Sequence, residues 1–280
     1  MPQTINTNLN SLNAQRNLNN SQSAVSVAMQ RLSSGLRVNS AKDDAAGLAI
    51  AERMNAQVKG MNVAVRNAND GISLAQTAEG ALGTVGNSLQ RMRELSIQAR
   101  NATNSPSDKD SLDKEFQQLA SEITRVLAGT TFNGKTLLGA SAGAQDFQIG
   151  ANTTANDVIT VTTTNMATDA SITAVTGGKI DSTTSTAQLK TIIDDIDGAL
   201  DRVNSERAVY GATQGRFDAI IANLQVSAEN QTAARSRIMD ADFAAETAAL
   251  SRAQILQQAG NAMVAQANQL PQQVLKLLQG

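Results

Sequence analysis

The apolar positions between Met54 and Leu89 repeat with the spacing of a coiled-coil helix. Met54, Val58, Met61, Val65, Ala68, Ile72 and Ala75 alternate in steps of four and three, and Leu82 and Leu89 continue the series after Glu79 and Gly86 interrupt it. A mean spacing of three and a half residues is the seam of a coiled coil. The pattern begins after the cap-type residues 39–44 and continues without proline to about Arg100, so it predicts a helix about 90 Å long. Such a helix cannot bury its apolar stripe alone, and the chain must supply partner helices.

Two further stripes are the candidates for these partners. Asn104-Ser-Pro106 reads as a turn followed by a helix start. The stripe after it consists of Leu112, Phe116, Leu119, Ile123 and Val126. Helical periodicity returns at Leu189 and continues to Ala228. We therefore expect a bundle of three long helices.

The two ends of the chain resemble each other in composition. Residues 1–42 and 247–280 contain no acidic residue, and both carry amphipathic stripes. We expect the two segments to fold together as a coiled coil. Its predicted seam consists of Ile5, Leu9, Leu12, Val25, Met29, Leu32 and Leu36 from the first segment, and of Leu256, Met263, Leu270, Val274 and Leu277 from the last. In the C-terminal segment the same heptads also include Ala253, Gly260 and Ala267.

The middle of the chain changes in character after Gly129, where Gly, Thr, Ser and Asn dominate. Residues 146–150 and 157–164 carry the branched and aromatic side chains that favour strands, so we predict one or two small hairpins. Residues 168–186 are predicted to be a surface loop of low order. The hydroxyl groups of this tract are candidates for glycosylation, although a solvated loop is the simpler interpretation.

The composition narrows the fold class and removes several kinds of function. Hydrophobic residues make up 41% of the chain but aromatic residues only 2%, which favours closely spaced long helices over a thick globular core. We predict a mainly α, elongated rod. The chain contains no Cys and no His, which excludes thiolate sites and the usual base of hydrolases. A net charge of -2 gives no general attraction to nucleic acid, and no apolar run is long enough for membrane insertion.

Two patterns that could carry chemistry have simpler explanations. Residues 129–136 match the phosphate-binding loop G-x-x-x-x-G-K-[ST], but that loop works between a strand and a helix, and here a helix is expected before it. We expect a turn there. Asp194, Asp195 and Asp197 alternate with isoleucines on one helix and are expected on its solvated face. The sequence therefore predicts no catalytic, metal or cofactor site.

The acid-free, Arg-bearing start is also the composition of an organellar transit peptide. A transit peptide would be dispensable and would have no partner elsewhere, whereas the C-terminal segment matches this one. N-terminal sequencing for cleavage would separate these two interpretations.

Several long segments resemble bacterial flagellin, the subunit of the flagellar filament. The longest is Arg66-Asn-Ala-Asn-Asp-Gly-Ile-Ser-Leu-Ala-Gln-Thr-Ala-Glu-Gly-Ala-Leu82, and residues 32–48, 131–134, 251–260 and 266–275 resemble further flagellin motifs. The resemblance covers both chain ends and nearly all of the helical part. It implies a structural protein of the extracellular filament used for swimming, and not an enzyme.

The resemblance also implies a domain organisation and a set of partners. Residues 1–44 and 240–280 correspond to the terminal coiled coil called D0, and residues 45–239 to the D1 bundle, with 130–185 as its hairpin and loop region. The outer domains D2 and D3 are missing. Flagellins are exported through the flagellar type III apparatus with the help of an export chaperone. They then polymerise with themselves between the hook-junction proteins and the filament cap.

Two host sensors are known to recognise this family. The segment around Arg91 resembles the D1 patch read by Toll-like receptor 5, which implies a recognition patch of Gln90, Arg91, Arg93, Glu94, Leu95 and Glu115. An inflammasome sensor reads apolar residues near the flagellin C-terminus, here Val274, Leu275, Leu277 and Leu278. We also expect the small or polar residues Asn69, Asp70, Gly71 and Glu79 to face neighbouring subunits of a filament.

Two alternatives lie close to this family. The flagellin-like protein that joins hook to filament shares the terminal coiled coils, but its central helices diverge more from the pattern seen here. Some flagellins carry a zinc protease in their variable region, and the absence of histidine excludes it.

Overall fold

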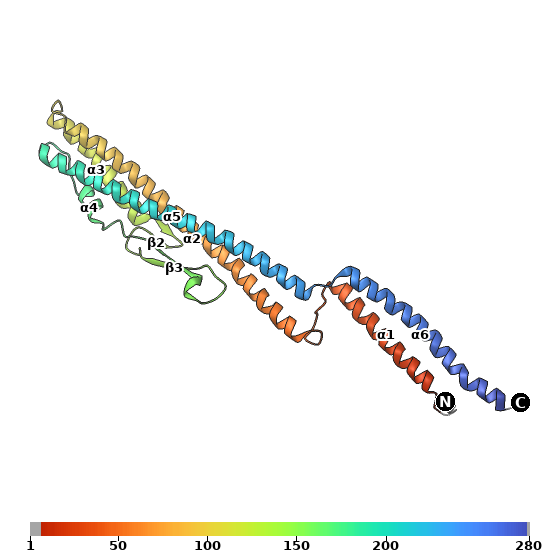
Figure 1. Cartoon of the computed structure of the whole chain (residues 1–280). Helices are drawn as coiled ribbons and strands as arrows, with labels where there is room; N and C mark the ends of the chain where they lie inside the picture. Colours follow the sequence, from red (N-terminus) through yellow and green to blue (C-terminus); the bar gives the residue numbers. More distant parts are fainter. Residues whose placement is uncertain (1–6, 279–280) are drawn as a thin grey trace. The chain divides into compact units, whose positions relative to one another are not determined.

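The computed structural model describes the backbone of residues 7–278 and the side chains of residues 7–269. Its helices are α1 (Leu9–Ser34), α2 (Ala45–Ala99), α3 (Pro106–Gly129), α4 (Ala170–Thr176), α5 (Thr186–Met239) and α6 (Phe243–Leu278) (Figure 1). Two small antiparallel sheets pair β1 (Thr131–Phe132) with β2 (Lys135–Thr136), and β3 (Ala144–Gln148) with β4 (Val158–Thr162). The predicted mainly α class is confirmed. Within the described residues, no helix has the length and apolar character needed to span a membrane.

The chain divides into two compact units. The first comprises the described parts of Met1–Ala56 and Asn230–Gly280, and the second comprises Gln57–Glu229. The first unit contains α1 and α6, which pack side by side, so the predicted pairing of the two chain ends is confirmed. Each of the long helices α2 and α5 contributes to both units.

The helix ends follow from local sequence. The Asn8 side chain accepts a hydrogen bond from the Ser11 N–H at the start of α1, and Gly35, with φ of 70°, ends this helix in the left-handed conformation that glycine tolerates. Ser105 and Asp108 form a reciprocal capping box at the start of α3, where Pro106 occupies the first turn. The Ser105 hydroxyl, with its backbone N–H, lowers the pKa of Asp108.

The core of the second unit lies between α2, α3 and α5. The predicted stripes supply it: Ala68, Ala75, Leu82 and Leu89 come from α2, and Phe116 and Ile123 from α3. The members with large side chains are fully buried. The packing of long helices α2 and α5 against each other is thus built from the residues whose spacing predicted it.

One contact in this core requires glycine. A Cβ atom placed on Gly71 of α2 would lie 2.6 Å from Cζ of Phe217 on α5. The Phe217 ring is buried and meets Phe147 of β3 edge-on, with 5.6 Å between ring centroids. The ring therefore has no room to move away. The expectation that Gly71 faces a neighbouring subunit is wrong, because it faces Phe217 of the same chain.

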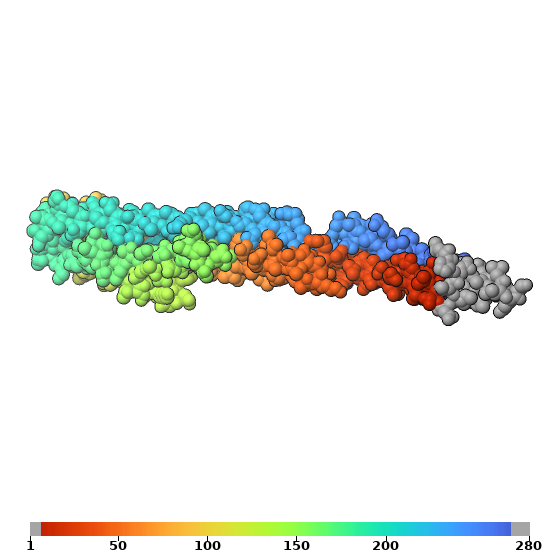
Figure 2. All heavy atoms as spheres, turned by 60° about the horizontal axis from the view of Figure 1, so that its bottom comes forward, coloured from red at the N-terminus to blue at the C-terminus, as the bar shows by residue number. Residues whose placement is uncertain are grey.

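The predicted hairpin is confirmed by β3 and β4. Phe147 is paired with Ile159 and Gln145 with Val161, and the alternate residues of each strand are more exposed. In Figure 2 the yellow-green residues of this region gather on one side of the second unit. The smaller β1–β2 hairpin turns at Asn133 and Gly134, whose φ angles are 47° and 79°. Two successive positive φ angles are typical of a type I′ turn.

The prediction of a loop of low order at residues 168–186 is wrong. This tract contains α4, which packs against α3, and Ile172, Val175 and Ile180 are buried. Asp169 caps α4 by accepting from the Ser171 N–H, and Arg202 of α5 donates to the same side chain. Ser and Thr obscured this short helix in the sequence, because its amphipathic stripe is only two apolar residues long.

The single tyrosine is buried in the second unit. Tyr210 is fully enclosed, and its hydroxyl lies near the Thr164 backbone without a hydrogen bond of good geometry. Burial, with a smaller contribution from the Glu206 carboxylate, raises the pKa of Tyr210 to about 12. The folded chain therefore resists ionisation of this hydroxyl.

Two glycines of α2 give a matched test of the Gly71 contact. Gly71→Ala is expected to lower the free energy of unfolding by about 1–3 kcal/mol, because the core is overpacked. Gly80→Ala adds its methyl group where nothing lies within 4 Å, so it should raise stability by about 1 kcal/mol. Thermal or urea unfolding followed by circular dichroism measures both. Equal effects of the two changes would contradict the contact.

The Tyr210 environment predicts a loss of stability in alkali. Because the pKa is raised on folding, the stabilisation is complete below the unfolded pKa near 10 and is lost as the pH rises from 10 towards 12. The loss should reach about 2–3 kcal/mol. Since the chain has one Tyr and no Trp, tyrosinate absorbance reports on this residue alone. Tyr210→Phe should remove this part of the pH dependence, and an ordinary tyrosine titration near pH 10 in the folded protein would contradict it.

Candidate self-assembly surface

The contact between α1 and α6 is made by small side chains. Ala28 of α1 and Ala253 and Ala267 of α6 are buried in it. At Gly260 an added Cβ would lie 3.3 Å from Cδ1 of Leu18 and 3.6 Å from its Cβ. Such small residues let two helix backbones approach closely.

Polar groups join the two helices at both ends of this contact. Asn8 Nδ2 donates to the Ala267 carbonyl oxygen at 2.7 Å, and the Ser11 hydroxyl donates to Asn268 Oδ1 at 2.8 Å. At the other end Arg31 Nη1 lies 2.9 Å from Glu246 Oε1. The helix pair is therefore held by polar contacts at its ends and by small apolar side chains between them.

The large apolar side chains of the predicted seam mostly lie outside this contact. Leu9 is 69% exposed, Met29 57%, Leu256 52% and Met263 62%. Leu12 is also exposed, and Val25, Leu32 and Leu36 are half-buried. Ile5 lies outside the described residues, as do the side chains of Leu270, Val274, Leu275, Leu277 and Leu278.

The expectation that all heptad residues of α6 face α1 needs correction. Ala253, Gly260 and Ala267, seven residues apart, face α1, whereas Leu256 and Met263 stay exposed. Because the two helices approach closely at these small residues, the other heptad position of α6, which Leu256 and Met263 occupy, stays exposed. One helix face is therefore left with large apolar side chains that the described part of the chain does not cover.

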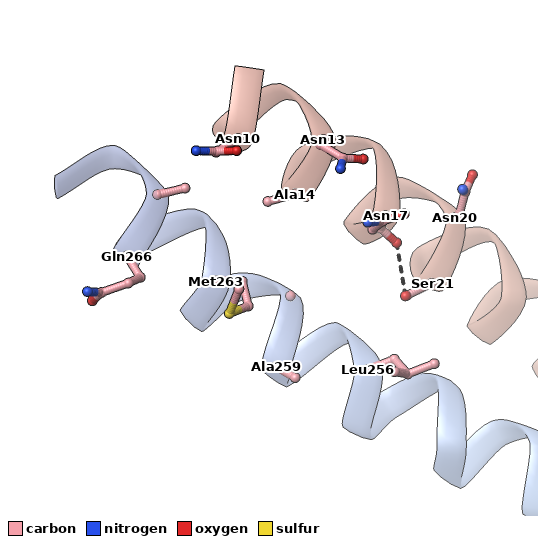
Figure 3. Close-up of a pocket in the computed structure, with 12 residues that line it drawn as sticks. Asn10, Asn13, Ala14, Asn17, Asn20, Ser21, Leu256, Ala259, Met263 and Gln266 are labelled. Carbon is pink, nitrogen blue, oxygen red and sulfur yellow. Dashed lines mark hydrogen bonds between the residues drawn. The ribbon is translucent and has the colours of Figure 1, made fainter. Parts of the chain in front are cut away.

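These side chains line a groove between α1 and α6 of about 670 Å³. Figure 3 shows Asn10, Asn13, Asn17 and Asn20 along α1 and Leu256, Ala259, Met263 and Gln266 along α6. No charged side chain lines the groove. A neutral groove edged by exposed apolar residues suits association with another neutral helix surface.

The predicted receptor patch lies in the second unit, on α2 and α3. Arg91 Nε donates to Glu115 Oε1 at 2.8 Å, and Arg91 Nη1 donates to Glu94 Oε2 at 2.9 Å. These two hydrogen bonds, that to Glu115 first, raise the pKa of Arg91. The structure thus brings Arg91, Glu94 and Glu115 together on one exposed surface, with Gln90 also exposed.

Two other members of the patch have different surroundings. Arg93 forms a two-pronged ion pair with Asp197 of α5, with N–O distances of 2.6 and 3.2 Å, which raises the pKa of Arg93. Leu95 is 0% exposed and belongs to the core, so it supports the surface from beneath. Asp197 is therefore an interhelical partner as well as a partly solvated side chain.

Other charged residues also find partners within the chain. Glu79 accepts two hydrogen bonds from Arg207 of α5, so its carboxylate has a partner within the chain while about a third of the side chain stays exposed. Asn69 and Asp70 are exposed. Asp194 pairs with Lys190 one turn away.

The local structure around residues 129–136 is a turn, as expected. Helix α3 precedes it and the β1–β2 hairpin occupies it, so the strand and helix of a phosphate-binding loop are both missing from this segment. Among the residues that the structure describes, no group of three acidic residues is placed to hold a metal ion.

Sequence reasoning missed the contacts that hold the terminal unit together. Arg31 and Glu246 lie 215 positions apart in the sequence, and no local pattern joins them. One signal was present: Glu246 is the only acidic residue of α6. The close contact between Gly260 and Leu18 was likewise not predicted, because a glycine at a heptad position usually indicates an interruption of the apolar seam.

The fold and this surface define a helical structural protein whose terminal helices present apolar side chains for association. Comparison with known proteins identifies the family. The model for the bacterial flagellin N-terminal helical region matches residues 5–143, and that for the bacterial flagellin C-terminal helical region matches residues 193–278. The chain belongs to the bacterial flagellin family, whose members are non-enzymatic, extracellular subunits of the flagellar filament.

Individual relatives agree with this assignment. A flagellin of Halalkalibacterium halodurans is 46% identical over 98% of this chain and 99% of its own length. A flagellin of Xenorhabdus nematophila is 42% identical over 99% of this chain and 100% of its own length. A structure from Vibrio parahaemolyticus described as flagellar hook-associated covers 71% of this chain and 100% of its own, with a TM-score of 0.61 at 12% identity. The last likeness shows the fold alone, and the sequence matches favour flagellin over a hook-junction protein.

Proposed function

We propose that the uncovered apolar surface of α1 and α6 drives polymerisation of this flagellin. The supporting observation is the exposure of Leu9, Met29, Leu256 and Met263, each half exposed or more. Burying one such side chain contributes about 1.5–3 kcal/mol. Leu256 and Met263 line the groove, so a second copy that covers the groove gains this free energy for these two side chains.

We propose the domain organisation from the resemblance to the flagellin family. Residues 1–44 and 240–280 act as the terminal coiled coil D0, and residues 45–239 act as D1, with 130–185 as its hairpin region. No D2 or D3 domain is present. Because the groove of one copy receives a different surface of the next copy, the contact is heterologous and growth continues as a helical fibre.

Removal of residues 240–280 tests this role. The remaining chain keeps the whole core of the second unit and should stay helical by circular dichroism, but it should form no filaments under conditions where the full chain polymerises. Electron microscopy is the readout. Filaments from the truncated chain would contradict the proposed role of the terminal unit.

A full-length pair of variants isolates the apolar groove. Leu256→Asn with Met263→Asn should raise the critical concentration for polymerisation at least about tenfold, through lost apolar burial. Gln254→Asn with Gln258→Asn changes two exposed polar residues of the same helix and serves as the control. Equal critical concentrations for the two variants, measured by sedimentation, would argue against the groove.

We propose further partners from the family resemblance. They are the filament cap, the hook-junction proteins, the export chaperone and the flagellar type III export apparatus. The export apparatus and chaperone act on the chain before it polymerises, and the cap and junction proteins contact the ends of the filament.

We also propose that D1 is recognised by Toll-like receptor 5 through Gln90, Arg91, Arg93, Glu94 and Glu115, with Leu95 holding the surface from below. The exposure of Arg91 and Glu115, close to half of each side chain, supports an accessible patch. The residues proposed for the inflammasome sensor are Val274, Leu275, Leu277 and Leu278.

Arg91→Ala should weaken receptor activation at least about tenfold, as expected when an interface arginine carries a large share of the binding energy. Arg125→Ala is the matched control, because Arg125 is an exposed arginine of α3 that also pairs with a glutamate on its own helix. A cell reporter assay with purified monomer measures both. Equal potency of the two variants would place recognition elsewhere.

A further inference from the structure

One ion pair connects the two terminal helices. Arg31 in the last turn of α1 and Glu246 in the first turn of α6 lie 2.9 Å apart, with 31% and 13% of their side chains exposed. Each charge also lies at the helix end where the helix dipole favours it. Among residues with described side chains, no other ion pair joins α1 to α6.

Next to this ion pair, backbone hydrogen bonds join the segment that follows α1 to the segment between α5 and α6. Residues 35–38 and 238–241, which we name the clasp, exchange hydrogen bonds: Ala241 N–H donates to the Gly35 carbonyl at 2.9 Å and Arg37 N–H donates to the Met239 carbonyl at 2.7 Å. Val38 is buried there against Met239. The ion pair is therefore anchored at one end of the helix pair.

The rest of the contact between α1 and α6 specifies register weakly. A seven-residue slip of α6 in either direction leaves a small residue at two of the three positions held by Ala253, Gly260 and Ala267. An alanine at the position of Gly260 would bring its Cβ 3.3 Å from Leu18 Cδ1, which a small shift of the leucine relieves. The hydrogen bond from Asn8 ends on a backbone carbonyl, and amide side chains such as that of Asn268 recur along α6. Both contacts can form again after the slip that brings Asn261 to the position of Asn268, whereas the opposite slip brings Leu275 there.

After a slip, no other pair of charged residues on α1 and α6 can replace the ion pair of Arg31 and Glu246. Glu246 is the only acidic residue of α6, and α1 contains two basic residues, Arg16 and Arg31, which are four turns apart. A slip of one heptad separates Glu246 from Arg31 by about 10 Å and leaves a largely buried carboxylate unpaired, which is costly. Polar pairs of this kind fix register in coiled coils at some cost in stability.

We infer that Arg31 and Glu246 are positioning residues that, together with the clasp, fix the register of the terminal helix pair, and with it the shape of the groove that receives the next subunit. This inference rests on the proposed role of that groove in polymerisation. The clasp joins the backbones next to the ends of α1 and α6, and the ion pair adds the side-chain contact that disfavours a slipped alignment within the helices.

A disulfide can report the register directly. The chain contains no cysteine, and the 3.6 Å between a Cβ at position 260 and Cβ of Leu18 lies within the range for a disulfide. Leu18→Cys with Gly260→Cys therefore reports the native alignment. Leu18→Cys with Ala253→Cys or Ala267→Cys reports a slip of one heptad in either direction.

Full-length proteins carrying these reporters are oxidised as monomer and as filament, and non-reducing gels separate intrachain from interchain products. Arg31→Glu and Glu246→Arg, each alone, should slow the 18–260 disulfide up to about fivefold, the upper range for a partly exposed pair, and should reduce filament yield. The exchanged pair Arg31→Glu/Glu246→Arg should restore part of both, because the ion pair returns while each exchanged charge lies at the helix end that the dipole disfavours. Arg16→Glu makes the same charge change on the exposed face of α1 and should leave the disulfide rate unchanged.

The outcomes separate the inference from the proposed function. An unchanged 18–260 disulfide in both single variants, or no recovery in the exchanged pair, would overturn the register role and leave polymerisation through the groove untouched. A chain locked by the 18–260 disulfide that forms no filaments would instead count against the proposed function. The burial of Tyr210 in the second unit, followed by its absorbance, shows that each variant is folded.

Discussion

The close contact between small side chains of α1 and α6 is the constraint on which the terminal unit depends. Ala28, Ala253, Gly260 and Ala267 bring the two backbones together, and Leu18 packs over Gly260. Leu256 and Met263 of α6 stay exposed beside this contact. Little apolar surface is buried between α1 and α6 of one chain, so covering Leu256 and Met263 would add to the stabilisation of the terminal helices. The same arrangement supports the proposed role of this helix pair in polymerisation.

The second unit is built on the opposite principle. Its large side chains are buried inside one chain, and the Phe217 ring fills the space that Gly71 leaves open. Interhelical ion pairs, such as Arg207–Glu79 and Arg93–Asp197, add contacts between α2 and α5 near the surface. This unit closes its core without help from another copy. The second unit therefore encloses its own core, whereas the first unit exposes apolar side chains that assembly is proposed to cover.

The charged surface of α2 shows how intrachain pairing affects recognition. The Nε and Nη1 atoms of Arg91 already donate to Glu115 and Glu94. A receptor that binds Arg91 must share or replace these acceptors, and the fixed position of the guanidinium lowers the entropy lost on binding. Glu115 thus has a structural role on this surface whether or not it touches a partner.

Much of the fold was accessible from the sequence, because helical periodicity is a local property. The spacing from Met54 to Leu89 and from Leu112 to Val126 located α2 and α3, and branched residues located the β3–β4 hairpin. The shared lack of acidic residues correctly paired the chain ends. The tract 168–186 was misjudged, since burial of Ile172 and Ile180 depends on α3 and not on their neighbours in sequence.

For the candidate site, too, the sequence determined some features and only the structure revealed the others. The heptads of α6 determined by themselves that this helix has an apolar stripe, and the family motifs determined that the chain builds a filament. Only the tertiary structure decided that Gly260 faces Leu18 while Met263 faces outward, that Leu95 lies beneath the receptor patch, and that Arg31 meets Glu246. The physical reason is that periodicity states which residues share a helix face, whereas the distance between two helices decides which part of that face is buried.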